Sequence, residues 1–475
     1  MKENTAIKIP SPLLSFVPVT VLVGLLAITI QVFDGDTLDG ASQIVLLTAS
    51  AVCCLIAIYR CGTRWKTIET AIVNNIAGVS SALLILLFIG ALSGSWMVSG
   101  VIPTLIYYGT KIIHPDFFLV TTCVICALVS VMTGSSWTTI ATIGIALFGI
   151  GKVQGFSEGW IAGAIISGAY FGDKISPLSD TTVLASSVTG TPLFQHIKYM
   201  MITTVPSMVI TLAVFLVAGF MYETTPSVEI AEFTSSLSRT YNISLWLLLV
   251  PVIMAALIIK RIPPVITLFL SAMAAGVAAI IFQPELLRQI AGPAANNIAS
   301  LFKGVMMTFY DSTQVETGNA MLNELAATRG MSGMMNTIWL IICAMCFGGS
   351  MTASGMLASI TSVFIRFIKG TTGLVSSTVA SGLFLNVCTA DQYLSIILTG
   401  DMFRNVYSQK GYESRLLSRT IEDGVTVTSP LIPWNTCGMT QATVLGVSTF
   451  AYLPYCFFNL ISPLMSILMA SRVKN

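Results

Sequence analysis

The sequence is poor in charged residues and nearly free of histidine. Charged residues make up 9% of the 475 residues, whereas soluble domains carry roughly 25%. Its only histidines are His114 and His196, and no serine–histidine–acid constellation is recognisable. The phosphate-binding pattern GxxxxGK followed by Ser or Thr is also missing. These absences argue against an enzyme and against ATP-driven transport, and a net charge of +2 gives no reason to expect a nucleic-acid partner.

Apolar residues dominate the composition instead. They make up 55% of the chain, the mean hydropathy is +0.85, and long apolar runs recur from Leu13 to Met469. A run of about 20 apolar residues has the length of one membrane crossing. The sequence therefore predicts an all-α polytopic membrane protein with about 10–13 spans. We expect it to lie in the lipid bilayer of a prokaryotic inner (plasma) membrane.

Two apolar stretches, 117–150 and 373–407, are too long for one straight crossing and have polar centres. The polar residues occupy 133–138 in the first stretch and 386–392 in the second. Each stretch predicts a re-entrant hairpin, in which two half-length helices meet at a polar tip. An ordinary helix pair with a short loop is the alternative.

The segment 168–182 places three charges, Asp173, Lys174 and Asp180, inside an otherwise apolar region. Pro177 removes a backbone donor there and breaks the helix. Such a break with charges is tolerated at membrane depth only where it is buried in protein or lines a wet cavity. The segment is therefore the best candidate for a transport site, although an ion pair that holds the broken helix together is the structural alternative.

Short patterns recur at nearly constant spacing in the two halves of the chain. The tripeptide Ser-Pro-Leu at 176–178 recurs at 429–431, and the pattern Gly-Ser-x-x-x-Ser-Gly at 94–100 recurs at 349–355. Secondary transporters commonly contain two such repeats with broken helices near the midplane. The sequence thus predicts two repeats.

The predicted repeats divide the chain into three parts. The first membrane repeat covers 1–222, a linker with a connecting span covers 223–260, and the second membrane repeat covers 261–475. In this alignment Asn435 and Thr436 occupy the places of Asp180 and Thr181.

Carboxylate, hydroxyl and amide oxygens are the ligands that a hard cation such as sodium prefers. Asp173 and Asp180 can each hold a cation or a proton, and so can Asp391, unless it only caps the helix that follows it. The candidate ligands of ions and protons are Asp173, Asp180, Ser176, Ser179, Thr181, Ser136, Asp391 and Asn435, with sodium itself expected at Asp180, Ser176 and Ser136. The candidate ligands of an organic substrate are Ser135, Thr138, Asn386, Thr389 and Thr436.

The strings at 133–138 and 168–182, followed by His196-Ile197-x-Tyr199-Met200, resemble the NhaC family of sodium/proton antiporters. The resemblance implies inverted repeats, two re-entrant hairpins, usually a homodimer, and an elevator-like motion. It implies no cofactor beyond sodium as the transported or coupling ion. Members of the family also include exchangers of small carboxylates, such as malate and lactate, and amino-acid transporters.

Two functional hypotheses follow from the residues and the resemblance. The first is a sodium/proton antiporter that binds cations and protons alternately at intramembrane carboxylates of a broken helix. The alternative is a sodium- or proton-coupled transporter or exchanger of a small carboxylate or an amino acid, which would use both hairpin tips to bind the organic group.

Overall fold

The computed structural model describes residues 10–33, 40–222, 227–292, 298–366 and 368–471, and within these ranges the regular elements are helices apart from one β-bridge between Thr313 and Thr328. The N-terminal part contains α1 (Pro12–Val32), α2 (Ala41–Cys61), α3 (Trp65–Gly78), α4 (Ser80–Val98), α5 (Val101–Ile112), η1 (Pro115–Phe117), α6 (Phe118–Thr133), α7 (Ser136–Thr139), η2 (Ile140–Gly144), α8 (Ile145–Val153), α9 (Glu158–Ile175), α10 (Asp180–Thr189) and α11 (Leu193–Met221). The middle part contains α12 (Ser227–Thr240), η3 (Leu245–Leu248), α13 (Leu249–Ile259), α14 (Pro264–Phe282), α15 (Pro284–Ala291), α16 (Ile298–Tyr310), α17 (Ala320–Ala326) and η4 (Ser332–Met334). The C-terminal part contains α18 (Met335–Ala353), α19 (Met356–Arg366), α20 (Gly370–Thr389), α21 (Gln392–Gln409), α22 (Ser414–Ile421), η5 (Glu422–Thr426), η6 (Ser429–Leu431), α23 (Thr436–Leu445), α24 (Thr449–Tyr452), η7 (Leu453–Tyr455) and α25 (Phe457–Ala470).

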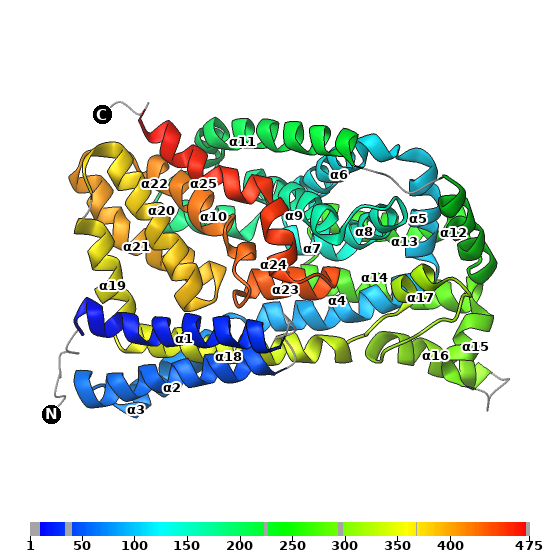
Figure 1. Ribbon diagram of the computed structural model, residues 1–475, viewed down its shortest axis with the longest axis horizontal. Coiled ribbons are helices and arrows are strands. Elements are labelled where there is room, and N and C mark those ends of the chain that lie inside the picture. Colours follow the sequence, from blue (N-terminus) through cyan, green and yellow to red (C-terminus); the bar gives the residue numbers. More distant parts are fainter. Residues whose placement is uncertain (1–9, 34–39, 223–226, 293–297, 367, 472–475) are drawn as a thin grey trace.

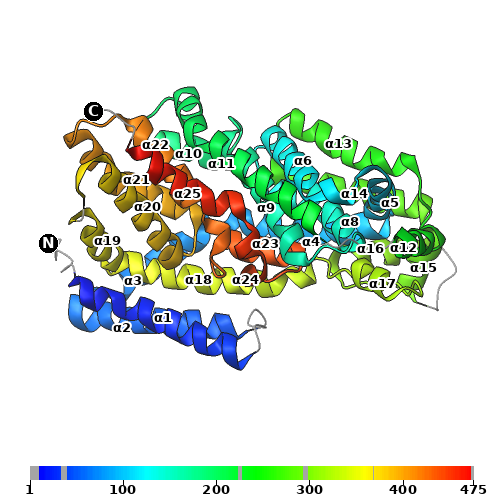
Figure 2. The same ribbon diagram turned by 45° about the horizontal axis from the view of Figure 1, so that its top comes forward.

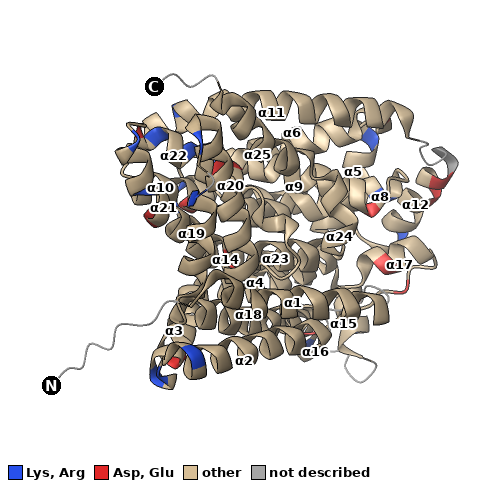
Figure 3. Ribbon diagram, turned by 60° about the vertical axis from the view of Figure 1, so that its left-hand side comes forward, with Lys and Arg blue, Asp and Glu red and all other residues tan. Residues whose placement is uncertain are grey.

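Among the described residues, nine helices are long and apolar enough to cross a membrane. The number rises to eleven if two bent pairs, Glu229–Thr240 with Leu245–Ile259 and Thr449–Tyr455 with Phe457–Ala470, each count as one span. Figure 3 shows that charged residues are sparse and gather mostly near helix ends and loops. The prediction of an all-α polytopic membrane protein is thus confirmed, with nine to eleven candidate spans where 10–13 were expected.

The helices pack into groups that bring distant parts of the chain together. α1 and α2 lie along one edge with α18, as Figures 1 and 2 show, and α3 also packs against α18. α9 lies in the interior, where it contacts α6, α8, α11 and α25. Helices from both halves of the chain therefore surround α9, which carries Asp173.

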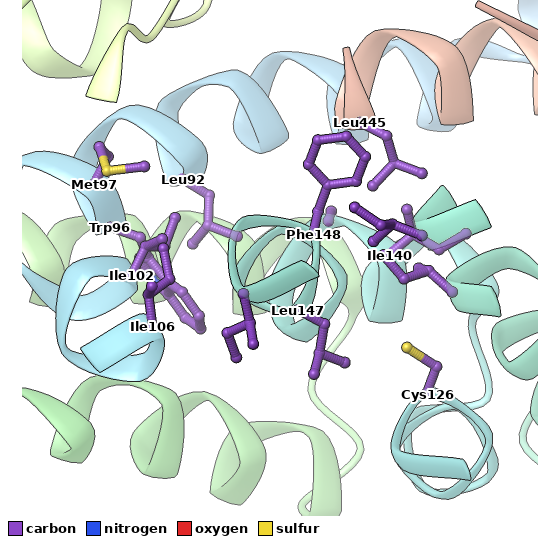
Figure 4. Packing of buried hydrophobic residues seen from close by; sticks show 14 of the residues in the cluster. Leu92, Trp96, Met97, Ile102, Ile106, Cys126, Ile140, Leu147, Phe148 and Leu445 are labelled. Atoms are coloured by element: carbon purple, nitrogen blue, oxygen red, sulfur yellow. The ribbon is translucent and has the colours of Figure 1, made fainter. Parts of the chain in front are cut away.

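Large apolar side chains position the first hairpin. Figure 4 shows Leu92 and Trp96 of α4, Ile106 of α5, and Leu147 and Phe148 of α8 in one buried cluster. Lipid tails are as apolar as these side chains, so close van der Waals packing, rather than removal from water, favours such contacts inside a membrane. The second arm of the hairpin is consequently held in place by α4 and α5.

Both long apolar stretches form helical hairpins. The first hairpin consists of α6 and the continuous run Ser136–Val153, and the second consists of α20 and α21. The turns contain Gly134 and Ala390, whose φ angles of 67° and 57° lie in the left-handed region. The arms contain 16 to 20 residues, so they approach the length of a full crossing of about 20 residues. The polar centres of the sequence are the turns of these hairpins.

The two hairpin tips repeat the same hydrogen bonds. The hydroxyl of Thr133 accepts from the N–H of Ser135 at 3.2 Å, and the hydroxyl of Thr389 accepts from the N–H of Asp391 at 3.2 Å. Ser135 and Asp391 then cap the following helix by accepting the backbone N–H three residues further on. The similarity of the two halves therefore extends from sequence patterns to the geometry of the tips.

A close approach between α6 and α9 depends on small residues. A Cβ atom on Gly168 would lie 2.1 Å from the carbonyl oxygen of Cys123, and one on Gly172 would lie 2.3 Å from that of Ala127. Small residues let helix backbones approach closely in membranes. This contact fixes the first hairpin against the helix that carries Asp173.

We expect Gly168→Ala to destabilise the protein by about 1–3 kcal/mol, because the backbone of α6 has to move away from the new methyl group. Thermal unfolding of the purified protein in detergent measures this loss. Gly24→Ala in α1 is the matched control, since no atom lies within 4 Å of a Cβ at that position. An equal loss of stability in both variants would contradict the packing argument.

Candidate functional site

The chain has two broken segments, one between α9 and α10 and a matching one between η5 and α23. A cavity of about 460 Å³ lies where both hairpin tips meet these two broken segments. Its remaining wall comes from the start of α4 and from the junction between α13 and α14. The polar and charged residues that line it are Ser81, Thr133, Ser135, Ser136, Thr138, Asp173, Ser179, Asp180, Thr181, Arg261, Thr267, Asp391, Gln392, Tyr393 and Thr436. The structure thus brings together residues that are more than 200 positions apart in the sequence.

Asp173 connects the first broken helix to the first hairpin tip. Its side chain is 6% exposed, and its Oδ2 accepts hydrogen bonds from the backbone N–H of Ser136 at 3.1 Å and from the Ser136 hydroxyl at 2.7 Å. Hydrogen bonds to a carboxylate are shorter and stronger than those between neutral groups. The tip therefore holds the carboxylate of Asp173 in a fixed direction at the cavity.

Asp391 plays a similar part at the second tip. It is 5% exposed, its Oδ1 accepts the N–H of Leu394 at 2.8 Å, and its Oδ2 accepts the hydroxyl of Thr436 at 3.2 Å. The carboxylate is thus a helix cap, which was the structural alternative in the sequence analysis, and it also lines the cavity. The Thr436 bond joins this tip to the second broken segment.

Asp180 is the most exposed of the three cavity carboxylates and begins α10. α10 and α23 both contain ten residues and end at a glycine in the left-handed conformation. Their N-caps are Ser179 and Asn435, so Thr436 occupies the place of Asp180. The alignment of Asn435 with Asp180 was wrong, because the second half contains an insertion of three residues before the helix rather than two.

Comparisons with known proteins show the family of the chain. The model of the Na+/H+ antiporter family matches residues 168–471, which is more than half of the chain. The chain belongs to this family. It is 37% identical over 427 residues to the malate-2H(+)/Na(+)-lactate antiporter of Bacillus subtilis, covering 90% of this chain and 88% of that protein.

Other relatives of the antiporter cover similar lengths. The Na(+)/H(+) antiporter NhaC of Bacillus subtilis is 35% identical over 410 residues, which cover 86% of this chain and 87% of that protein. The arginine/ornithine antiporter ArcD of Halobacterium salinarum is 34% identical over 459 residues, which cover 96% and 90% of the two chains. The resemblance to the NhaC family is therefore confirmed, and so is the prediction of a transporter rather than an enzyme.

Two residues that were predicted to bind ions in the antiporter do not line the cavity. The hydroxyl of Ser176 donates to the carbonyl of Val131 at 2.8 Å, which ties the break to α6. Asn435 caps α23 by accepting the N–H of Cys437 at 3.1 Å. The polar atoms of both side chains hold the broken segments in place, and neighbouring residues line the cavity instead.

Two predicted substrate ligands likewise lie outside the cavity. The amide nitrogen of Asn386 donates to the carbonyl of Val425 at 2.7 Å, and this bond joins the second hairpin to η5. The hydroxyl of Thr389 lies 2.8 Å from that of Ser395 within the tip. The other predicted ligands, Ser135, Ser136, Thr138, Ser179, Thr181 and Thr436, line the cavity together with the three aspartates.

Lys174 pairs with a carboxylate from the second half of the antiporter. Its ammonium donates to Oδ1 of Asp423 and, at 3.1 Å, to the hydroxyl of Ser462, and both charged side chains are 0% exposed. The observed pair joins α9 to η5, so it agrees with the structural alternative of an intramembrane ion pair.

Arg261 and Tyr393 line the cavity although they were not predicted there, and so does Gln392, which belongs to the predicted polar tip at 386–392. Gln392 and Tyr393 directly follow Asp391, so their position at a polar tip was a usable signal. Arg261 follows α13 in a loop and has a positive φ of 58°, and its place in the sequence gives no indication that it reaches the first hairpin.

Proposed function

We propose that the protein exchanges sodium ions for protons across a prokaryotic plasma membrane. Asp173, Asp180 and Asp391 are the proposed carriers of the cation and the proton, and the observation that carries the proposal is that all three line one cavity. Ser136, Ser179 and Thr181 supply neutral oxygen atoms beside them. The membership in the Na+/H+ antiporter family supports the same assignment.

The physical basis is competition for the same carboxylates. Burial destabilises the free anion of Asp173 and Asp391, so each gains from binding a proton or a metal cation. Three carboxylates in one cavity also repel one another, which strengthens their binding of any positive charge. If each carboxylate changes sides of the membrane only when it is neutralised, sodium moving one way requires protons moving the other way.

The proposal is tested with purified protein in liposomes that contain a pH-sensitive dye. We expect sodium chloride added outside to make the lumen more alkaline, because sodium enters as protons leave. Choline chloride at the same concentration serves as the control and should give no change. A lumen pH that responds equally to both salts would refute sodium/proton exchange.

A second candidate function is sodium- or proton-coupled exchange of a small carboxylate. Among the described residues that line the cavity, Arg261 is the only cation, and a guanidinium binds carboxylates in a bidentate manner. The cavity volume of about 460 Å³ also exceeds the space that a bare ion needs. One relative is named a malate-2H(+)/Na(+)-lactate antiporter.

The two candidates differ in their dependence on Arg261. If the substrate is a carboxylate, liposomes should take up labelled malate or lactate in a sodium-dependent manner, and Arg261→Gln should lower this uptake about tenfold or more. If sodium and protons are the only substrates, uptake of labelled acids should be absent, and Arg261→Gln should retain sodium/proton exchange.

We also propose that 1–222 and 261–475 are the two repeats, that 223–260 joins them, and that the protein is a homodimer with an elevator-like motion. The matching geometry of the hairpin tips supports the repeats. The dimer and the motion rest on the family resemblance. Cross-linking of the protein in native membranes, followed by determination of its mass, tests the dimer.

A further inference from the structure

Glu422 is a buried carboxylate that forms no ion pair with any of the described residues. It is the first residue of the π-helix η5, and its side chain is 0% exposed. Among the described residues, neither of its carboxylate oxygens accepts a hydrogen bond of good geometry, and the hydroxyl of Thr426, one turn along the same short helix, is the only neutral side chain that interacts with it. Buried polar groups are normally satisfied, so an acid in this position calls for an explanation.

The charged groups closest to Glu422 come from α9 and from η5 itself. Lys174, Asp173 and Asp423 interact electrostatically with its carboxylate. Lys174 already donates to Asp423 and to Ser462, so it is not a dedicated counter-ion of Glu422. No hydrogen bond or ion pair joins Glu422 to Asp173 in the described part of the chain.

Further titratable groups of the region lie one helical turn away, on α11, and on α21, where Tyr407 interacts electrostatically with Arg419. Arg419 has its Nε 3.7 Å from Oδ2 of Asp423, and its guanidinium lies 5.2 Å from the ring centre of Tyr199. His196 is buried and pairs through Nδ1 with the hydroxyl of Ser418 at 2.8 Å. Lys174 and Arg419, the two cations of this cluster, therefore both pair with Asp423.

An unpaired carboxylate buried in this way is unstable as an anion, so it carries a proton in this arrangement. The two hydrogen bonds that Ser136 donates to Asp173 favour the ionised form of Asp173. The negative charge of Asp173 then opposes ionisation of Glu422. A cation that neutralises Asp173 removes the repulsion and leaves Lys174 as the nearby positive charge. Glu422 can then release its proton.

We propose that Glu422 is a second proton-binding site of the antiporter, distinct from the cavity carboxylates, and that it is coupled to them through Asp173 and Lys174. The proposal rests on the proposed sodium-binding role of Asp173. Because linkage is reciprocal, sodium bound at Asp173 weakens proton binding at Glu422, and a proton at Glu422 weakens sodium binding by the same factor. Sodium and this proton therefore exclude each other without sharing a ligand.

The test is the number of protons released when sodium binds to the purified protein in weakly buffered detergent solution. A pH indicator reports the release, and radioactive sodium reports the amount bound. We expect Glu422→Gln to bind sodium but to release about one proton fewer per bound sodium than the unchanged protein does. Its sodium affinity should also depend less steeply on pH. Glu229→Gln, which changes an exposed glutamate on α12, is the matched control and should release as many protons as the unchanged protein.

Glu422→Asp keeps the acid and provides a second variant in case Gln prevents folding. It should restore the lost proton, whereas a merely structural role of Glu422 would leave the proton count unchanged in every folded variant. Equal release from Glu422→Gln and the unchanged protein overturns the proposal. A wrong assignment of the sodium site would give a different result. Asp173→Asn would then bind sodium as well as the unchanged protein does, whatever number of protons the Glu422 variants release.

Discussion

Replacing Asp173 by asparagine is expected to abolish sodium-dependent proton flux while the protein stays folded. Asparagine has the same shape, and its oxygen can still accept hydrogen bonds from Ser136, which donates to this position from both its N–H and its hydroxyl. The variant lacks the negative charge and cannot bind a proton in exchange for sodium. Sodium binding and proton binding are therefore both lost at this position.

The size of the effect follows from the loss of one charge in a site that is 6% exposed. Two unit charges about 4 Å apart attract each other by about 4 kcal/mol at an effective dielectric constant of about 20, which corresponds to about a thousandfold in affinity. Flux in liposomes with an internal pH dye, recorded over a range of sodium concentrations, measures this change.

Two further variants separate a specific effect from a general one. Asp401→Asn removes an exposed carboxylate of α21 outside the cavity, and we expect it to retain wild-type flux. Ser136→Ala removes one of the two bonds to Asp173 and should have a smaller effect, about tenfold to a hundredfold in sodium affinity. Wild-type flux in Asp173→Asn would refute the role of Asp173, provided that its elution and melting profiles match those of the unchanged protein.

The sequence predicted the helical architecture and the positions of the hairpin turns because lipid restricts the chain so strongly. A spanning segment has to be an apolar helix, and a polar interruption has to be buried in protein. The polar centres at 133–138 and 386–392 therefore marked the turns that contain Gly134 and Ala390. The lengths of the hairpin arms were harder to predict, since apolar residues extend each helix beyond the expected half crossing.

The candidate site could be predicted only in part, because residue type does not determine where a side chain points. Ser176 and Asn435 have suitable oxygen atoms, yet they bond to backbone groups outside the cavity. The partner of Lys174 lies 249 residues further along the chain, and no local pattern predicts such a contact. Asp173 and Asp391 were predicted because acids at polar breaks in a membrane protein are costly unless they have a function.

Replacing Asp423 by asparagine is expected to destabilise the protein by about 3–5 kcal/mol, the typical cost of removing one partner of a buried ion pair. Its carboxylate accepts from the ammonium of Lys174 and from the hydroxyl of Thr203 at 3.1 Å, and it lies 3.7 Å from Nε of Arg419. Without this anion, two buried cations remain beside each other in a region that excludes water. The midpoint of thermal or denaturant unfolding in detergent measures the loss.

A double variant tests whether charge, rather than packing, causes this loss. Lys174→Met removes one of the two cations, so Asp423→Asn combined with Lys174→Met should recover most of the stability that Asp423→Asn alone loses. Glu413→Gln is the control for an ordinary ion pair, because Glu413 is exposed and pairs with Arg415 on the surface. Such a pair contributes about 0–1 kcal/mol.

The stability of the double variant decides between charge and packing. If the losses of Asp423→Asn and Lys174→Met simply add in the double variant, the Lys174–Asp423 pair does not hold the two broken segments together through charge. Recovery in the double variant would instead show that this ion pair determines how the two broken segments fit together. Sodium/proton exchange by the protein could then be measured in a folded variant that lacks Lys174.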